Sequence, residues 1–358
     1  MLIRRYLALE VAYTLLATLL VLLGIIFVQR LAMYLSQAAS GLLSQNAILG
    51  LLGLQMLRFA TELLPLSFFI AALMTFGRLY RDSEMSAMFA LGVSVNDLYK
   101  SLLIISIPIS IVLVGLNFYV IPKNVQFQHD LQTKARKDAQ LNIFKAGVFR
   151  ELMGGKHVIY VGKIADNGTE LVDVFVKSLE DSGKISITTA KTGRQSIDAD
   201  TGIRFLHLFD GGRYEVEHDL SKDKDKEIMV TFKSMRLKID QTPPLKSLST
   251  DARSTKDLIK DYTHNSAAEL QKRLSGPLSL FILVLMIPSL AHSRPRDGRY
   301  NRLILGVIIY VIYFNLLKIG EAWLHKEMIP MILGLWWVHL VMLSLGLYMR
   351  YKRNNLLS

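Results

Sequence analysis

Six long apolar runs, three on each side of a more polar stretch, organise the chain. They cover residues 11–28, 47–77, 101–122, 274–291, 303–317 and 328–349. Most are uncharged over roughly the 17–25 residues that a helix needs to cross a bilayer. A chain in lipid must satisfy its backbone hydrogen bonds internally, so each run is expected to be a helix. The pattern predicts a polytopic α-helical membrane protein with six transmembrane helices, arranged three plus three around an inserted domain.

The stretch between the two groups, from about residue 140 to 245, has the pattern of β structure. Segments rich in β-branched and aromatic residues occur at 158–161, 172–176, 185–188, 204–209 and 228–232. Several alternate apolar with polar positions, as half-buried antiparallel strands do. Turn signals containing glycine separate them at 166–168, 181–183, 200–202 and 210–212. Six or more strands at this spacing predict a sandwich, a jelly roll or an open barrel.

A polar connector joins the β stretch to the fourth apolar run. Its sequence predicts a helix from about Ser254 and a second helix start at Ser266. Ser266 and Glu269 have the spacing of a capping box, in which each side chain bonds the backbone N–H near the other. The second helix is therefore expected to begin at Ser266 and to run into the membrane.

The orientation of the chain follows from the Lys/Arg balance of its short connections. Basic residues gather at the N-terminus, between the second and third runs, between the fourth and fifth runs, and at the C-terminus: Arg4, Arg5, Arg78, Arg81, Lys100, the segment 292–302, Arg350, Lys352 and Arg353. With six spans these all lie on one side, which is expected to be the cytoplasm. Both termini are then cytoplasmic and the inserted domain is extracytoplasmic. No cleavable signal peptide is expected, because the first run is too long for a signal core.

Composition narrows the functional classes. Much of the net charge of +12 lies in the cytoplasmic flanks, where it orients helices and meets anionic headgroups. No basic face with interleaved aromatic residues is present, so nucleic acid is not an expected partner. The chain has no cysteine, which excludes disulfides and thiolate metal sites.

The sequence carries no catalytic constellation. The end of a phosphate-binding loop is similar to the segment Gly154, Gly155 and Lys156. The rest of the motif is missing, because Arg150 replaces the required first glycine and no Ser or Thr follows the lysine. That stretch is interpreted as a hairpin turn. The histidines lack metal-ligand spacing, and no nucleophile elbow occurs. The chain is predicted to be no enzyme, to hold no metal and to bind no cofactor.

A short amphipathic helix is predicted at about residues 82–91, in the connection between the second and third runs. Asp82 or Ser83 can cap it, and Glu84 in its first turn complements the helix dipole. Met85, Met88 and Phe89 share one face, and Gly92 suits the end of the helix. Two interpretations stay open: an interfacial helix resting on lipid headgroups, or a helix that docks with Glu84 and its Met/Phe face into a cytoplasmic partner.

Charged residues within or beside the apolar runs form a second group of candidates. The outer part of the membrane is predicted to contain Arg30, the pair Arg58 and Glu62, and the pair Lys318 and Glu321. Such residues are costly in lipid and usually pair together or face a cavity. Either the acids neutralise their neighbours while Arg30 and Lys318 snorkel, or Arg30, Arg58 and Lys318 form a cationic rim for an anionic lipid headgroup.

At this point the chain resembles the LptF/LptG permeases of the lipopolysaccharide exporter, and the LptF branch more closely. The resemblance covers almost the full length and rests on the three-plus-three layout. It also rests on the loop 79–94 with its acid at Glu84, on Leu63-Leu-Pro-Leu-Ser67, and on Ala268-Glu-Leu-Gln-Lys-Arg273. The resemblance implies residues 1–122 as three spans with a cytoplasmic coupling helix, 123–265 as a periplasmic β-jellyroll domain with connectors, and 266–358 as three further spans.

The resemblance also implies partners and a mechanism. An LptG-like permease would complete a heterodimer on an LptB-like ATPase dimer, which would use ATP and Mg²⁺. An LptC-like protein would extend the jellyroll by strand pairing. Carried over by position, the loop residues Arg81, Asp82, Glu84, Met85, Met88, Phe89 and Gly92 would couple the permease to the ATPase. ATP-driven closure would then push lipopolysaccharide from the outer leaflet of the bacterial inner membrane into the jellyroll.

Two other classes of function compete with this one. A non-transport scaffold for envelope assembly could use the same β domain to anchor a partner, and would need no ATPase. A membrane-bound enzyme acting on lipid is disfavoured by the missing acid/base or metal cluster.

Overall fold

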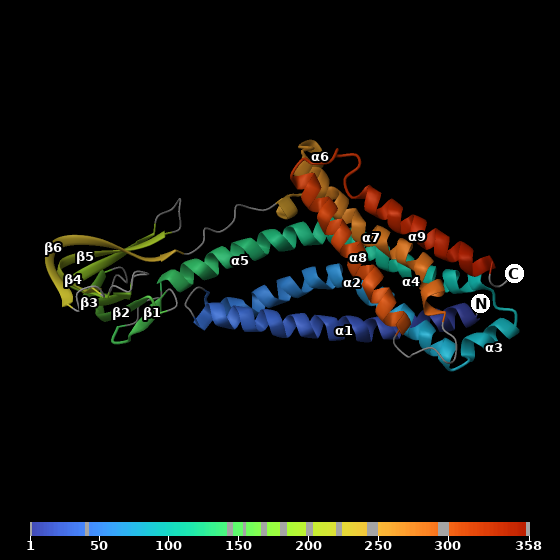
Figure 1. Cartoon of the computed structure of the whole chain (residues 1–358), viewed down its shortest axis with the longest axis horizontal. Helices are drawn as coiled ribbons and strands as arrows, with labels where there is room; N and C mark the ends of the chain where they lie inside the picture. The colour runs from blue at the N-terminus through green and yellow to red at the C-terminus, as the bar shows by residue number, and fades with distance from the viewer. Residues whose placement is uncertain are drawn as a thin grey trace. The chain divides into compact units, whose positions relative to one another are not determined.

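The computed structural model describes residues 2–39, 43–141, 146–152, 155–165, 170–179, 185–197, 203–219, 224–241, 250–292 and 301–355 (Figure 1). The chain forms two compact units, each built from separate stretches of sequence. The helical unit comprises Met1–Leu31, Leu49–Asp130 and Leu248–Ser358, and the sheet unit comprises Ala32–Ile48 and Leu131–Ser247. The predicted boundaries at 122 and 265 therefore fall inside continuous helices.

The helices follow the predicted apolar runs. They are α1 (Leu2–Ala39), α2 (Ile48–Arg81), α3 (Glu84–Ala90), α4 (Val95–Gly115), α5 (Ile121–Leu141), α6 (Thr255–Lys260), α7 (His264–Ala291), α8 (Asn301–His325) and α9 (Trp336–Asn355). Short turns η1 (Gln45–Ala47) and η3 (Thr250–Ala252) precede α2 and α6, and the π-helical segment η2 (Leu116–Val120) joins α4 to α5. Among the described residues, five segments are long and apolar enough to cross a membrane, namely Leu2–Ala39, Gln45–Arg81, Val95–Ala135, His264–Ala291 and Arg302–His325. The chain is a multi-pass membrane protein.

The sixth predicted span begins later than the sequence pattern suggests. Residues 328–335 form turns instead of helix, and α9 starts at Trp336. Gln271 of α7 explains the difference, because its amide Nε2 donates to the Met331 carbonyl at 2.7 Å and its Oε1 accepts from the Leu335 N–H at 2.7 Å. A Cβ on Gly334 would lie only 1.9 Å from Oε1 of Gln271. The turn is thus wrapped around one polar side chain, and only glycine fits beside it.

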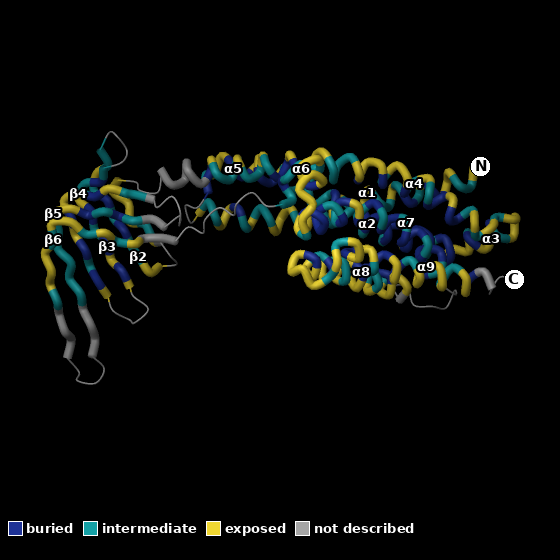
Figure 2. Tube along the Cα trace, turned by 90° about the horizontal axis from the view of Figure 1, so that it is seen from above, coloured by how far each residue is buried: buried dark blue, intermediate teal, exposed yellow. Residues whose placement is uncertain are grey.

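Helix α7 forms the centre of the helical unit and packs against α4, α8 and α9. Of the most apolar 18-residue stretch of α7, 67% is buried, whereas only 6% of the corresponding stretch of α1 is buried. In Figure 2, dark blue stretches lie on α2 and α7, whereas α8 carries much yellow. The core is built from large side chains such as Phe68, Phe69, Phe76 and Tyr313. An exposed helix in a membrane unit faces lipid or a partner helix, so α1 and α8 present the surfaces for such contacts.

The connector before α7 confirms one helix start and corrects the other. Ser254 caps α6, because its Oγ accepts from the Asp257 N–H. The predicted capping box at Ser266 is wrong. Thr263 caps α7 and its Oγ1 accepts from the Ser266 N–H, so that Ser266 lies inside the first turn. Glu269 is then free of any capping role and binds Arg273 instead.

The sheet unit confirms the inserted antiparallel β domain. Its strands are β1 (Arg150–Leu152), β2 (His157–Ile164), β3 (Glu170–Leu179), β4 (Ile185–Ile197), β5 (Ile203–Asp219) and β6 (Lys224–Gln241). They form one sheet in the order β1-β2-β3-β4-β5-β6, each antiparallel to the next. Leu171, Val174, Val176, Leu206 and Leu208 lie in the small core on one face. The turn signals at 166–168, 181–183 and 200–202 lie outside the described residues, but each falls between two paired strands.

The signal at 210–212 is not a turn, which corrects the sequence interpretation. Asp210 and Gly211 lie inside the continuous strand β5, and Asp210 has φ +49°. Strand pairing is interrupted along one line that crosses five strands at Gly162, Asp173, Lys191, Asp210 and Lys233. Asp173 also has positive φ, a conformation that Asp tolerates better than most residues. The register is the same on both sides of this line, so it interrupts the pairing without inserting a residue.

Candidate functional site

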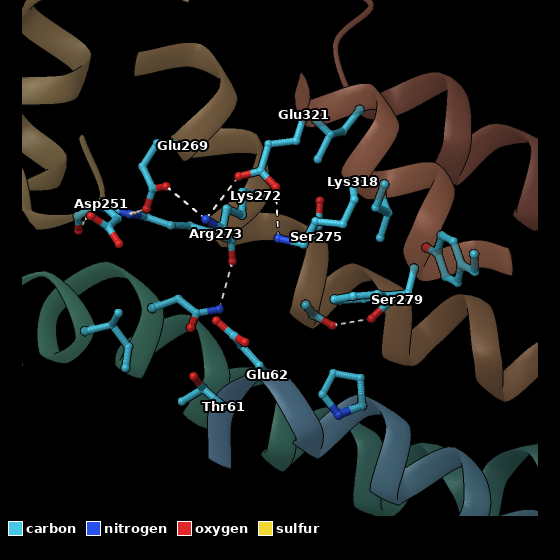
Figure 3. Close-up of a pocket in the computed structure, with 18 of the residues that line it drawn as sticks. Thr61, Glu62, Asp251, Glu269, Lys272, Arg273, Ser275, Ser279, Lys318 and Glu321 are labelled. Carbon is cyan, nitrogen blue, oxygen red and sulfur yellow. Dashed lines mark hydrogen bonds and ion pairs between the residues drawn. The ribbon is translucent and has the colours of Figure 1, made fainter. Parts of the chain in front are cut away.

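A polar pocket within the helical unit is the strongest candidate site. It has a volume of about 140 Å³ and is lined by residues of α2, η2, α5, η3, α7 and α8, together with Leu335. The acidic and basic side chains that line it are Arg58, Glu62, Asp251, Glu269, Lys272, Arg273, Lys318 and Glu321. Figure 3 labels all of these except Arg58. Four cations and four anions therefore meet at one place in a largely apolar unit. Such clusters in membrane segments mark functional sites by default.

Arg58 on α2 is neutralised from two directions. Its Nε lies 3.4 Å from Glu62 Oε1, one helical turn away, and its Nη1 lies 3.1 Å from Asp251 Oδ2 in η3. The pairing with Glu62 follows the sequence prediction, since residues four apart share a helix face. The pairing with Asp251 could not be foreseen, because it joins segments nearly two hundred positions apart in the sequence.

Lys272 and Lys318 share one acid. Glu321 on α8 lies 3.1 Å from Lys272 Nζ and 3.0 Å from Lys318 Nζ. Lys272 also lies 3.6 Å from Glu269 Oε2 on its own helix. The Lys318 side chain is half exposed, whereas the Glu321 side chain is 15% exposed. Lys318 is thus the more accessible cation of this pair, and it is held at the pocket by a buried carboxylate.

Arg273 is a structural residue at the back of the pocket. Only 4% exposed, it pairs with Glu269 at 3.0 Å and donates to Thr255 Oγ1 and to the carbonyls of Asp251 and Arg253. Its guanidinium thereby fastens η3 and α6 onto α7. A buried charge needs this many acceptors to offset its lost hydration. This arrangement also places Asp251 where it reaches Arg58.

A proline creates the contact that closes the pocket beside η2. Pro277 inside α7 lacks an N–H, which leaves the Arg273 carbonyl without its helical donor. Asn117 of η2 supplies the missing donor, with its Nδ2 3.1 Å from that carbonyl. Aromatic and apolar residues also line the pocket, namely Tyr310, Phe314 and Leu317 of α8 and Pro65 of α2. The pocket therefore presents both charged and apolar groups.

The structure brings together two of the three cations nominated for headgroup contact. Arg58 and Lys318 line the pocket, and Arg30 does not. The Arg30 guanidinium lies over the Phe59 ring, 4.9 Å from its centroid. Lys272, Arg273, Glu269 and Asp251 were missed as site residues, although the segment 268–273 had already been singled out as a motif. Within the described ranges, no group of three His, Asp or Glu side chains gathers as a metal site would require.

The second candidate site is α3, with its preceding turn. Arg81 pairs with Asp82 at 3.2 Å, and Ser83 occupies the N-cap position with φ +61°. Glu84 Oε2 accepts from the Tyr6 hydroxyl at 3.1 Å, and Glu84 Oε1 lies 3.6 Å from Arg78 Nη1. The acid is therefore held by α1 and α2 while its side chain stays 40% exposed.

The prediction of a docking face made of Met85, Met88 and Phe89 needs correction. Met85 is fully buried and Met88 is 9% exposed, and both belong to the main core of the helical unit. Phe89 is partly buried and packs against Tyr80, with ring centroids 6.3 Å apart. The chain's own helices cover this face, because burying the methionine side chains is more favourable in free energy than exposing them to water. The exposed surface of α3 is formed by Ser86, Ala87 and Ala90, followed by Leu91 and Gly92.

Comparison with known proteins agrees with this architecture. The family model described as lipopolysaccharide export system permease LptF/LptG matches residues 5–352. The lipopolysaccharide export system permease protein LptF of Escherichia coli (strain K12) is 28% identical over 351 residues, covering 97% of this chain and 94% of that protein. The proteins of the same name from Escherichia coli O157:H7 and Shigella flexneri have the same identity and the same coverage.

Proposed function

The chain belongs to the LptF/LptG family of lipopolysaccharide export permeases, and we propose that it is a membrane subunit of an ATP-driven lipopolysaccharide exporter. In this proposal it takes lipopolysaccharide from the outer leaflet of the bacterial inner membrane. It then passes the lipid to a periplasmic bridge built from β-jellyroll domains. The observation that carries the proposal is the match over nearly the whole chain, helices and inserted sheet together.

The proposed complex contains three further kinds of subunit. An LptG-like permease encloses, together with this chain, a cavity for the lipid. An LptB-like ATPase dimer supplies the energy. An LptC-like protein continues the periplasmic bridge. The long strand β6 supports the last contact, because it ends the sheet with one edge not paired to another described strand. An added strand can bind such an edge through main-chain hydrogen bonds. The apolar face of the sheet, with Val174 and Leu206, would cover the acyl chains.

Coupling to the ATPase is assigned to α3. Glu84, Arg81 and Asp82 are accessible, and the surface of Ser86, Ala87 and Ala90 is open to a partner. Met85 and Met88 then have a different role from the one predicted by sequence. They anchor α3 in the core that α2, α4 and α7 share. A displacement of α3 would pass through these anchors to the spans, since packed cores transmit strain.

The pocket at Arg58 and Lys318 is proposed to meet the phosphorylated headgroup of the lipid, with Arg30 as a further contact. All the cations that line the pocket already face acids at salt-bridge distance. A phosphate must therefore compete with Glu62, Asp251 and Glu321. Such competition suits a transport site, because a site that binds cargo must also release it.

Co-purification of the detergent-solubilised complex tests this function against the scaffold alternative. We expect a second permease, an ATPase and lipopolysaccharide to be retained with the chain. Glu84→Ala should lose the ATPase while membrane insertion and the second permease are kept. Asp130→Ala, which removes an exposed acid of α5, is the matched control. Recovery of the wild-type chain without any ATPase, or full ATPase recovery with Glu84→Ala, would count against the coupling role.

A further inference from the structure

A second cavity of the helical unit lies outside the pocket described above. It is a groove of about 570 Å³ between α4, α7 and α9. Its walls are apolar and include Leu103, Phe281, Leu285, Leu340 and Leu343. Leu340 is 60% exposed, so the groove opens onto the outer surface of the helical unit. An apolar groove on a membrane-spanning unit is filled by hydrocarbon, since no water is available there.

The dimensions of the groove suit one acyl chain. Its lining runs along α9 from Trp336 to Arg350. The fourteen residue-to-residue steps between them cover about 21 Å at about 1.5 Å per step. One leaflet contributes about 15 Å of the roughly 30 Å hydrocarbon core. A lipid chain that lies in the groove with its headgroup at Arg350 therefore stays within the length of α9.

Arg350 lines one end of the groove, and Arg353 lies beyond it on α9. Arg350 lies over the Tyr99 ring, 4.8 Å from the centroid, with Asn96 Oδ1 at 3.5 Å as its polar contact. Arg353 follows three residues later on the same helical face. It is 6% exposed and donates to the Tyr80 hydroxyl through Nη2. Its Nε and Nη1 are buried without a hydrogen-bond partner among the described residues.

No carboxylate of the described residues pairs with either arginine. A buried guanidinium without a counter-ion is expensive, and leaving it unpaired costs more than most single interactions contribute. The other buried arginine described above, Arg273, has a carboxylate and three further acceptors. Among the described residues, this contrast leaves Arg350 and Arg353 as the arginines that an added anion can complete.

We propose that this groove binds an anionic phospholipid, with one acyl chain between α4, α7 and α9 and the headgroup phosphate at Arg350 and Arg353. Arginine suits this role because its fork of N–H groups matches a phosphate. Under the predicted topology this lipid belongs to the cytoplasmic leaflet, in contrast to the transported lipid of the outer leaflet. The bound lipid would brace α9 against α4, next to Tyr80 and thus next to Phe89 of α3.

Native mass spectrometry of the full chain, purified with its co-expressed subunits, tests the proposal. The probes are phosphatidylglycerol and zwitterionic phosphatidylcholine, titrated separately. We expect phosphatidylglycerol to bind the wild type more tightly. The double variant Arg350→Gln/Arg353→Gln should weaken that binding about tenfold or more, because charge-assisted hydrogen bonds are lost. Lys352→Gln removes one positive charge from an exposed position between them and should change binding less than about twofold.

A variant of the groove wall provides a second test, which does not depend on whether the double variant folds. Leu340→Trp adds bulk at the exposed wall and keeps both arginines. It should reduce phosphatidylglycerol binding while the complex still elutes as the wild type does in size-exclusion chromatography. Equal binding of the two lipids to the wild type would overturn the proposal. Unchanged phosphatidylglycerol binding in the double variant, or an equal loss in Lys352→Gln, would overturn it as well.

Discussion

At the scale of single residues, the helical unit pairs the charges of its main pocket and leaves two arginines of α9 without an acid among the described residues. Arg273 shows what full compensation requires, with one carboxylate, one hydroxyl and two carbonyls around a single guanidinium. Arg58 and Lys318 are less deeply buried and hold fewer partners. The fully compensated residue is therefore structural, and the partly exposed cations are those that a ligand can reach.

The first prediction concerns Arg273. Arg273→Ala should destabilise the chain by about 3–5 kcal/mol, because the buried Glu269 would keep only Lys272, 3.6 Å away, as a partner. A clear fall in the melting temperature of the detergent-solubilised chain is the expected readout. Lys256→Ala, at an exposed position of α6, should leave the melting temperature nearly unchanged. Similar melting temperatures for the two variants would show that Arg273 does not fasten the connector to α7.

The second prediction separates binding from pairing at Arg58. Arg58→Gln should weaken photo-crosslinking of lipopolysaccharide to the pocket, whereas Asp251→Asn should strengthen it. The opposite signs follow because Asp251 competes with a phosphate for the same guanidinium, 3.1 Å away. A change of about fivefold in each direction corresponds to about 1 kcal/mol per interaction. Parallel losses in both variants would mean that the pair only supports the fold.

At the scale of elements, the hydrophobic pattern identified the helices and mistook three local features. The Met/Phe face of α3 was predicted to meet a partner, but the same periodicity also fits a face buried in the chain's own core. The signal Asp210-Gly-Gly212 lies inside the continuous strand β5, where a Cβ on Gly211 would lie 2.1 Å from the Thr189 carbonyl oxygen. Ser266 and Glu269 have the spacing of a capping box, yet the structure begins the helix three residues earlier, with Thr263 as the N-cap. In each case the local sequence is compatible with two structures, and a tertiary contact determines which one forms.

The third prediction tests the two faces of α3 separately. Ala87→Arg, on the exposed face, should reduce ATPase recovery and leave the melting temperature of the chain unchanged. Met85→Ala should lower the stability by about 2–5 kcal/mol, as expected for a fully buried side chain. Thermal unfolding and quantitative co-purification distinguish the two effects. Full ATPase recovery with Ala87→Arg would place the docking surface elsewhere.

At the scale of the whole molecule, the layout of three spans, a β domain and three spans could be predicted because apolar runs of this length admit few alternatives. The order of the strands was left open, since register depends on pairings that the sequence does not specify. The pocket was only half predicted. Arg58 and Lys318 are predicted from charged pairs within apolar runs, whereas Asp251 lies in a polar connector, where an acid is not unusual.

The most direct test of the proposed function is transfer of lipopolysaccharide in a reconstituted system. Proteoliposomes would contain this chain with its partner permease and ATPase, and the readout would be lipopolysaccharide crosslinked to a soluble jellyroll acceptor. We predict transfer that requires ATP and this chain, and that falls when Glu84→Ala uncouples the ATPase. Transfer that proceeds equally without ATP, or equally in proteoliposomes lacking this chain, would contradict the assignment of an ATP-driven permease.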